Sequence, residues 1–174
     1  NNTINLSCNK WYVFLADERV VPLTHKDSNY KLACESFLLD IGVPKEQIYA
    51  INPNLDNIQD IALNYQLNLL NIVQNKLQNN HLNFDLILLG IGPDGHICSL
   101  FPSHSLLQEE DKYIASITNS PKLPPKRITM TYKLLNLAKH IIFIASGTSK
   151  YPIIQQVVQK NKTLPCTLLT NTSI

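Results

Sequence analysis

The sequence predicts a single α/β domain with a mainly parallel sheet and helices on both faces. Three short apolar runs alternate with helical patterns, as in proteins whose parallel strands are joined by helices. The runs lack period-2 alternation, which is typical of strands covered on both faces. With 174 residues, of which 44% are hydrophobic, the chain can form one sizeable core. The predicted strands are residues 11–16, 84–89 and 140–145.

Three helices are predicted from apolar side chains spaced three and four residues apart. Gly42 and Pro44 are expected to end the first helix, and Asp56 is the expected N-cap of the second. Pro152 is tolerated in the first turn of the third. A further strand-like run covers residues 113–117. The predicted helices are residues 30–41, 58–77 and 153–159.

A polar or glycine-rich loop follows each of the three predicted strands. The loops are residues 17–19, 90–96 and 146–150. In open α/β sheets, ligands bind beyond the carboxyl ends of the strands. If the strands are parallel neighbours, these loops converge on one edge and form a binding site there.

Composition excludes several classes of protein. The net charge of +2 and the absence of a basic stripe with interleaved aromatics argue against nucleic acid as a partner. No apolar run approaches the ~20 residues of a membrane span, so no membrane partner is expected. The cysteines show no paired or metal-ligand spacing, so we expect reduced thiols, no metal and a cytoplasmic protein. They are Cys8, Cys34, Cys98 and Cys166.

Residues 90–95 match the G-x-G-x-x-G pattern of dinucleotide-binding loops. However, Pro102 follows Gly95 after only seven residues, which leaves little room for the helix that would hold a pyrophosphate. The acidic residues about 20 positions on precede the next strand-like run instead of ending it. A nucleotide site is therefore not favoured.

Asp94 and His96 lie in the same loop, after a predicted strand. An imidazole at this position could act as a general base, because its ordinary pKa lies near working pH. Asp94 could hold the imidazole or contact a substrate hydroxyl. The alternative is that Asp94 caps a short helix and His96 is simply a polar side chain.

Residues 120–127 contain three prolines and three cations, a combination that suits an extended loop binding a phosphate. The alternative is a solvated basic turn. Arg19 adds a cation after another strand, unless it pairs with the two acidic residues before it. Lys150, in the third loop, is a weaker candidate. The cations of the proline-rich loop are Lys122, Lys126 and Arg127.

These segments occur in an order that resembles one known family. They are DERVVP (17–22), SNY (28–30), FDLILLGIGPDGH (84–96), SLFP (99–102), and SPK through RIT (120–129). Together they resemble the 6-phosphogluconolactonase family. The 84–96 segment alone would also resemble the glucosamine-6-phosphate deaminases, whereas the other segments resemble the lactonase branch.

The resemblance implies hydrolysis of 6-phospho-D-glucono-1,5-lactone to 6-phospho-D-gluconate in the oxidative pentose phosphate pathway, with no cofactor. His96 would activate water and Asp94 would support it. The phosphate would lie among Arg19, Lys122 and Arg127. The resemblance leaves the oxyanion donor unassigned, and backbone N–H groups of the glycine-rich loop are one candidate. Further expected substrate contacts are Asn29, Gly92, Gly95 and Lys150. Alternatives are a deaminase and a non-catalytic sugar-phosphate-binding domain.

One departure from the family concerns what lies outside the matching segments. In the family, a strand and a glycine-containing phosphate loop precede the segment at 17–19, and a closing strand follows residue 165. We therefore expect residues 1–174 to be one Rossmann-like layered domain that lacks both strands, truncated or part of a longer chain. The resemblance also suggests fusion to, or pairing with, glucose-6-phosphate dehydrogenase.

Overall fold

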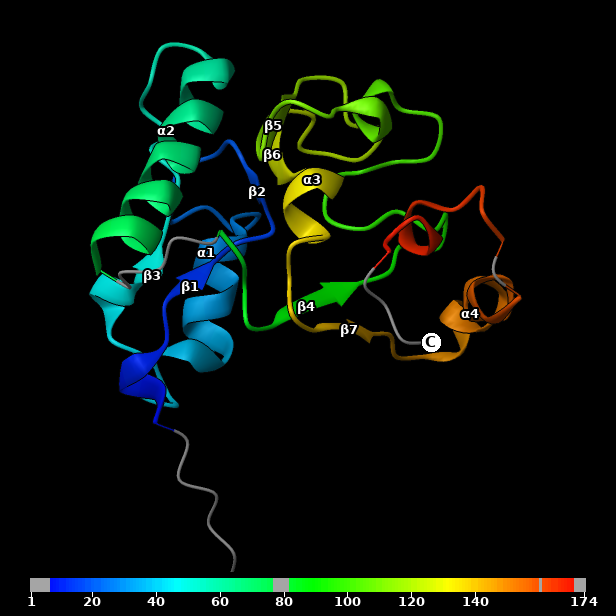
Figure 1. The fold of residues 1–174 in the computed structure, drawn as a ribbon, viewed down its shortest axis with the longest axis horizontal. Helices are drawn as coiled ribbons and strands as arrows, with labels where there is room; N and C mark the ends of the chain where they lie inside the picture. Colours follow the sequence, from blue (N-terminus) through cyan, green and yellow to red (C-terminus); the bar gives the residue numbers. More distant parts are fainter. Residues whose placement is uncertain (1–6, 77–81, 160, 171–174) are drawn as a thin grey trace, which may run out of the picture.

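The computed structural model describes residues 7–76, 82–159 and 161–170 (Figure 1). These residues form two parallel strand pairs, one three-stranded antiparallel sheet and four α-helices, which confirms the predicted α/β class. The strands are β1 (Val13–Phe14), β2 (Asp17–Arg19), β3 (Ile48–Tyr49), β4 (Ile87–Gly90), β5 (Ile114–Ile117), β6 (Arg127–Met130) and β7 (Ile141–Ile144). The α-helices are α1 (Asn29–Ala33), α2 (Ile58–Asn71), α3 (Tyr132–Leu135) and α4 (Tyr151–Val158).

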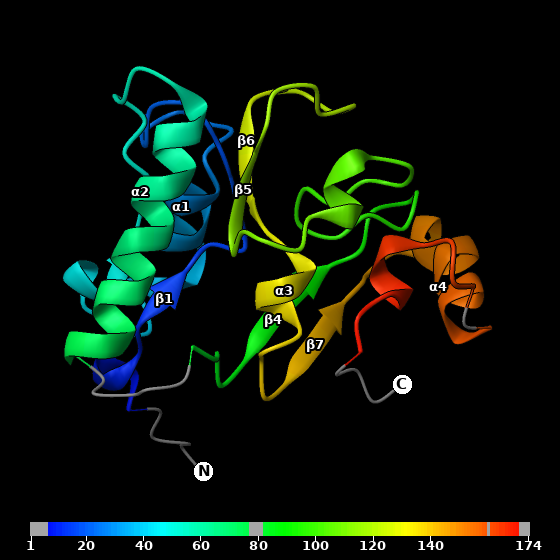
Figure 2. The ribbon, with the colours of Figure 1, turned by 45° about the horizontal axis from the view of Figure 1, so that its top comes forward.

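The parallel pairs contain all three apolar runs that the sequence marks as strands. β1 pairs with β3, which was not predicted, and β4 pairs with β7 (Figure 2). The expectation of burial on both faces is wrong for β4 and β7. Leu89 is only 3% exposed, whereas Leu88 and Ile144 on the opposite face are 50% and 57% exposed. Within the described residues, the core covers one face of this pair.

The antiparallel sheet, in the order β2-β6-β5, was not predicted as a unit. The run at 113–117 is confirmed as β5, but residues 17–19, expected as a loop, form β2. Asp17 lies opposite Thr129, and Arg19 lies opposite Arg127. Hydrophobic patterning could not reveal β2, because its three residues are charged and their partners are provided by distant segments.

The first predicted helix begins as α1 and continues as a π-helical turn, Cys34–Leu38. The Ser28 side chain accepts a hydrogen bond from the Lys31 N–H at its N-terminus. Gly42 has φ +86°, a conformation that glycine adopts without strain, which agrees with the predicted stop.

The second predicted helix forms α2 and a following π-helical turn, Ile72–Lys76; its expected end at residue 77 lies outside the described residues. Its N-cap is Asn57, not Asp56. The Asn57 Oδ1 atom accepts a hydrogen bond from the Asp60 N–H at 2.8 Å. The third predicted helix is confirmed as α4, which begins two residues earlier, at Tyr151, with Pro152 in its first turn. The short helix α3 was not predicted.

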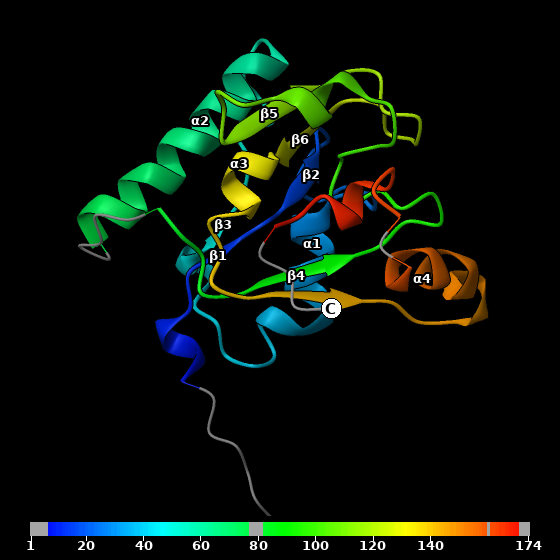
Figure 3. The ribbon, with the colours of Figure 1, turned by 45° about the vertical axis from the view of Figure 1, so that its right-hand side comes forward.

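Helix α2 packs against the antiparallel sheet, as Figure 3 shows. Ile61, Tyr65 and Leu69 on α2 are buried in the main core together with Ile128 of β6. The Tyr65 hydroxyl accepts a hydrogen bond from the Leu15 N–H at 2.6 Å and lies 3.2 Å from the Leu15 carbonyl oxygen. This contact ties α2 to the short segment between β1 and β2.

Glu18 joins β2 to the start of α1. Its side chain is only 1% exposed. The carboxylate accepts hydrogen bonds from the N–H groups of Arg19, Asn29 and Tyr30, each at 2.7 Å, and from the Ser28 hydroxyl at 3.1 Å. Burial raises the pKa of Glu18, although all four hydrogen bonds oppose that rise. The Glu18 carboxylate thus fixes β2, including its neighbours Asp17 and Arg19, next to the N-terminus of α1.

We predict that Glu18→Gln destabilises the protein by about 2–3 kcal/mol, because the new amide group would face hydrogen-bond donors. Urea unfolding at pH 7 of the chain at its natural length measures this loss. Glu35→Gln is the matched control, since Glu35 is exposed and pairs only loosely with Lys31; we expect a change within about 0.5 kcal/mol. Equal stabilities of the two variants would contradict the role of Glu18.

Candidate active site

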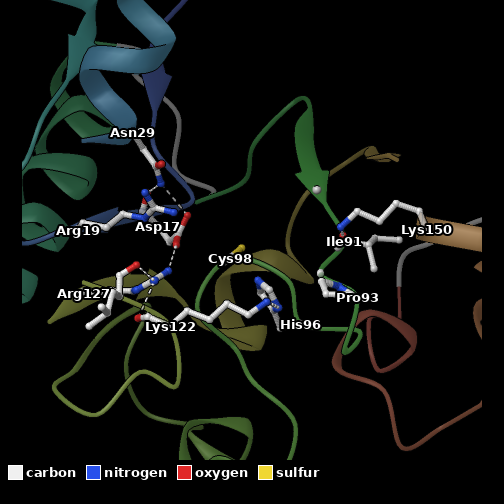
Figure 4. Close-up of a pocket in the computed structure, with 13 residues that line it drawn as sticks. Asp17, Arg19, Asn29, Ile91, Pro93, His96, Cys98, Lys122, Arg127 and Lys150 are labelled. Atoms are coloured by element: carbon white, nitrogen blue, oxygen red, sulfur yellow. Dashed lines mark hydrogen bonds and ion pairs between the residues drawn. The ribbon is translucent and has the colours of Figure 1, made fainter. Parts of the chain in front are cut away.

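The polar loops predicted to converge do meet at one pocket, of about 400 Å³ (Figure 4). Its lining combines residues from β2, from the glycine-rich loop after β4, from the proline-rich loop before β6, and from the loop after β7. Side chains from all four segments face it: Asp17, Arg19, His96, Lys122, Arg127 and Lys150. The pocket brings together residues up to about 130 positions apart in the sequence. Its volume lies within the 300–1,000 Å³ range of small-molecule sites.

His96 lines the pocket and pairs with the carboxylate of Asp94 in the same loop. His96 Nδ1 is 2.5 Å from Asp94 Oδ1, and the His96 ring lies 4.7 Å from the ring of Phe101. The ammonium of Lys122 is 3.6 Å from the same Asp94 oxygen and 3.3 Å from His96 Nδ1. With the Nδ1 proton donated to Asp94, the neutral imidazole carries its lone pair on Nε2.

The surroundings favour a neutral imidazole beside a charged carboxylate. Burial lowers the pKa of His96 below its ordinary value of 6.5, and Lys122 lowers it further; Asp94 and, more weakly, Asp17 oppose that change. For Asp94, burial acts to raise the pKa, but the hydrogen bond with His96 and the charges of His96 and Lys122 outweigh it, so the pKa is lowered. His96 can therefore accept a proton at neutral pH, and the alternative in which Asp94 merely caps a helix is not what the structure shows.

The two glycines expected to contact substrate shape this loop. Gly92 donates its N–H to the His96 carbonyl oxygen at 2.8 Å, and Gly95 donates to the Gly92 carbonyl oxygen at 3.0 Å. Their N–H groups are thus already engaged, which argues against both as oxyanion donors. Gly95 has φ +80° and lies against Leu164, and a Cβ on Gly92 would overlap the His96 ring. Gly92 lines the pocket, and close packing of the loop requires glycine at both positions.

Arg19 and Arg127 face each other directly across the β2–β6 ladder, an arrangement in which two like charges repel. Burial and the charge of Arg19 lower the pKa of Arg127. Arg19 Nη1 donates to the Asp27 carbonyl oxygen at 2.8 Å, whereas its Nε is buried with no hydrogen-bond partner among the described residues. The sequence had left open an ion pair between Arg19 and Asp17 or Glu18. Among the described residues Arg19 forms neither pair, and Asp17 lies near Arg127 instead. The pair is suited to an anion.

Arg127 also holds the proline-rich loop in place through hydrogen bonds to its backbone. The loop is therefore not the solvated basic turn considered above. Only 3% exposed, Arg127 donates hydrogen bonds to the carbonyl oxygens of Pro124, Lys122 and Leu123 at 2.9–3.0 Å. The three cations of the loop therefore separate: Arg127 is buried beside Arg19, Lys122 reaches His96, and Lys126 is exposed.

Asp17 was given no role from the sequence, yet its carboxylate connects three segments. Oδ1 accepts a hydrogen bond from Asn29 Nδ2 at 3.0 Å, and Oδ2 accepts one from the Ser99 hydroxyl at 2.7 Å. Arg127 Nη1 lies 3.8 Å from Oδ2. The amide of Asn29, expected to contact substrate, is thus directed to Asp17. Asp17 and Ser99 both belong to the segments that carry the family resemblance, 17–22 and 99–102. This membership was the feature of the sequence that could have indicated their role.

Two further residues of the pocket have partners within the protein. The ammonium of Lys150 donates a hydrogen bond to the Ile91 carbonyl oxygen at 2.6 Å, so this lysine supports the glycine-rich loop. Cys98 lines the pocket with φ +51°. Burial, together with the charge of Asp17, raises the pKa of the Cys98 thiol well above its ordinary value, so the thiol stays neutral and is a poor nucleophile.

Metal-binding clusters and membrane-spanning helices are both absent from the part of the chain that the structure describes. There, no three His, Cys, Asp or Glu side chains lie close enough together to hold a metal ion. None of the helices in these ranges combines the length and the apolar character needed to span a bilayer.

We predict that Gly92→Ala displaces the His96 ring, since the added methyl group would occupy its position, and costs about 1–3 kcal/mol of stability. The His96 ring signals in NMR spectra and urea unfolding report the two effects. Gly90→Ala is the matched control, because a Cβ there meets nothing within 4 Å. Unmoved His96 signals in Gly92→Ala would show that the loop can accommodate a side chain.

Sequence and structure comparisons place this arrangement among known proteins. The chain is 42% identical over 159 residues to a probable chloroplastic 6-phosphogluconolactonase of Oryza sativa subsp. indica, covering 88% of this chain and 49% of the relative. It is 39% identical to a human 6-phosphogluconolactonase, covering 92% of this chain and 61% of the relative. The chain thus spans about half to three fifths of the length of these relatives.

A solved structure shares the fold, and a family model shares the sequence pattern. The 6-phosphogluconolactonase of Thermotoga maritima matches 94% of this chain and 70% of its own, with a TM-score of 0.78 at 24% identity. The model for "Glucosamine-6-phosphate isomerases/6-phosphogluconolactonase" matches residues 1–173. The resemblance noted from the sequence is therefore confirmed: the chain belongs to the glucosamine-6-phosphate isomerase/6-phosphogluconolactonase family.

Proposed function

We propose that the protein hydrolyses 6-phospho-D-glucono-1,5-lactone to 6-phospho-D-gluconate, as a step of the oxidative pentose phosphate pathway. The observation that carries the proposal is one pocket with His96 on one side and the Arg19–Arg127 pair on the other (Figure 4), where His96 is itself paired with the Asp94 carboxylate. Relatives about 40% identical to this chain bear the name 6-phosphogluconolactonase, which supports the choice of substrate.

The arginine pair is the proposed site of the 6-phosphate. Arg19 and Arg127 occupy opposite positions of the β2–β6 ladder, so their like charges repel, and a phosphate dianion bound between them would replace that repulsion by attraction. The buried Nε of Arg19 supplies an N–H that lacks a partner among the described residues. Binding the phosphate at this end orients the rest of the sugar toward His96, and such orientation lowers the barrier to reaction.

His96 is the proposed general base. Its Nε2 accepts a proton from water as the water oxygen bonds to the lactone carbonyl carbon, C1. The carbonyl electrons move to oxygen, and the tetrahedral intermediate then breaks the bond between C1 and the ring oxygen. The imidazolium returns its proton to that oxygen, which becomes a hydroxyl, and the new carboxylic acid loses its proton to solvent. Asp94 stabilises the transient imidazolium.

The reaction requires no electron transfer, so we propose that no redox cofactor takes part. Pairing or fusion with glucose-6-phosphate dehydrogenase stays a prediction from the family resemblance, and a cytoplasmic location stays a prediction from the spacing of the cysteines. The rice relative is named chloroplastic, so location is a property to be measured for this protein.

We predict that His96→Ala lowers kcat/KM for the lactone by about 10²–10⁴-fold, the usual contribution of a general base. Product formation is followed with 6-phosphogluconate dehydrogenase, above spontaneous hydrolysis, using the protein at its natural length. Binding of 6-phosphogluconate should be retained, because Arg19 and Arg127 are unchanged. His140→Ala, at an exposed histidine before β7, is the matched control and should keep wild-type turnover.

Two experimental outcomes would contradict the proposal and indicate a different function. Equal background rates for wild type and His96→Ala, with phosphosugar binding intact, would indicate a non-catalytic sugar-phosphate-binding domain. Release of ammonia from glucosamine 6-phosphate would indicate the deaminase branch, which the family also contains.

We also predict the pH dependence of kcat/KM, which reports the free enzyme. The base must be unprotonated, so activity rises as pH rises through the pKa of His96. Because that pKa is lowered by burial and by Lys122, the acidic limb should have its midpoint below 6.5. A midpoint at or above 6.5, measured at constant ionic strength, would contradict the assignment of His96 or its surroundings.

A further inference from the structure

Lys122 connects the two ends of the pocket through its own backbone and side chain. Its carbonyl oxygen accepts a hydrogen bond from Arg127 Nη2 at 2.9 Å. Its ammonium lies at the other end, beside His96 (Figure 4), 3.3 Å from His96 Nδ1 and 3.6 Å from Asp94 Oδ1. From the sequence, Lys122 is expected among the phosphate-binding cations, yet in the structure its charge lies at the imidazole–carboxylate pair.

The position of the Lys122 ammonium favours one protonation state of the His96–Asp94 pair, with His96 neutral and Asp94 charged. An ammonium group donates hydrogen bonds and accepts none, so it and the Nδ1 proton of His96 both point to the Asp94 carboxylate. A neutral imidazole fits this arrangement. A protonated imidazole would place a second positive charge about 3 Å from the first, both facing one carboxylate oxygen.

We propose that Lys122 is a positioning residue for the general base: its ammonium group holds the Asp94 carboxylate against His96 and keeps the imidazole unprotonated. This inference rests on the proposed function for its role in catalysis, but its electrostatic part concerns the free protein. The charge of Lys122 thereby offsets the tendency of Asp94 to keep His96 protonated. The base stays ready to take a proton from water.

The other groups that act on His96 are few. Asp94 and Asp17 are the acidic groups whose charges favour the imidazolium, and Lys122 is the cation that opposes them. The Phe101 ring covers one side of the imidazole, and the neighbouring Cys98 thiol is neutral. Removing the charge of Lys122 therefore leaves burial alone to oppose the effect of the two carboxylates on the pKa of His96.

The test is an NMR titration of His96 in the protein at its natural length, without substrate. The ring signals of His96 are identified by their loss in His96→Gln. Lys122→Met removes the charge, Lys122→Arg retains it, and Lys126→Met is the matched control on an exposed lysine of the same loop. We expect the titration midpoint of His96 to shift upward in Lys122→Met and to stay near wild type in the other two variants.

Turnover provides the second readout. In Lys122→Met, the acidic limb of kcat/KM should shift to higher pH by the same amount, so the loss of activity at pH 6 is recovered at pH 8. A lysine that only bound phosphate would instead weaken binding of 6-phosphogluconate at every pH and leave the midpoint of His96 unchanged.

Three results would overturn the inference: an unchanged midpoint in Lys122→Met, a lowered one, or an equal shift in Lys126→Met. Lys122→Gln is a second neutral variant should the methionine disturb the loop, and it must show the same upward shift. Because the titration uses free protein, its outcome is independent of lactone hydrolysis. A protein that shows the shift but no turnover would contradict the proposed function alone.

Discussion

The antiparallel pairing of β2 with β6 is the constraint on which the pocket depends. It places Arg19 opposite Arg127 and directs the Glu18 carboxylate to the start of α1. It also leaves the Asp17 carboxylate where Asn29 and Ser99 both bind it. Three consecutive charged residues thus hold a helix, the loop that follows His96, and one side of the proposed anion site. Strand alternation makes this possible, because the side chains of residues 17 and 19 point to one face and that of residue 18 to the other.

The charges of the pocket are arranged so that few are left without a counter-charge or hydrogen bond. Asp17 lies near Arg127, Asp94 lies between His96 and Lys122, and Lys150 binds a carbonyl oxygen of the glycine-rich loop. The exception is the arginine pair, in which two like charges occupy opposite positions of the β2–β6 ladder and the Arg19 Nε lacks a partner among the described residues. Such local repulsion is costly in a folded protein, which is why we propose the phosphate site at this pair.

Prediction from the sequence succeeded where the physical signal is local. The apolar runs identified β1, β4 and β7, and periodicity located α1, α2 and α4. It failed for β2, because a hydrophobic pattern cannot report a strand built from charged residues. It also predicted that β4 and β7 are covered on both faces, whereas Leu88 and Ile144 are half exposed. An apolar residue shows what a strand can bury, but it does not show which of its faces the described chain covers.

The sequence by itself indicated that the loops at 17–19, 90–96 and 146–150 converge, because the carboxyl ends of parallel strands lie at one edge of a sheet. The proline-rich loop was expected at the same site only from the family resemblance. The sequence did not determine what each residue contacts. Lys122 and Arg127 are five positions apart in one loop, yet one lies at the imidazole and the other is buried beside Arg19. Likewise Asn29 and Gly92 carry groups able to bind a ligand, but the fold uses those groups internally. Only the tertiary structure decides this, since hydrogen bonds and ion pairs act over a few ångströms between segments far apart in the chain.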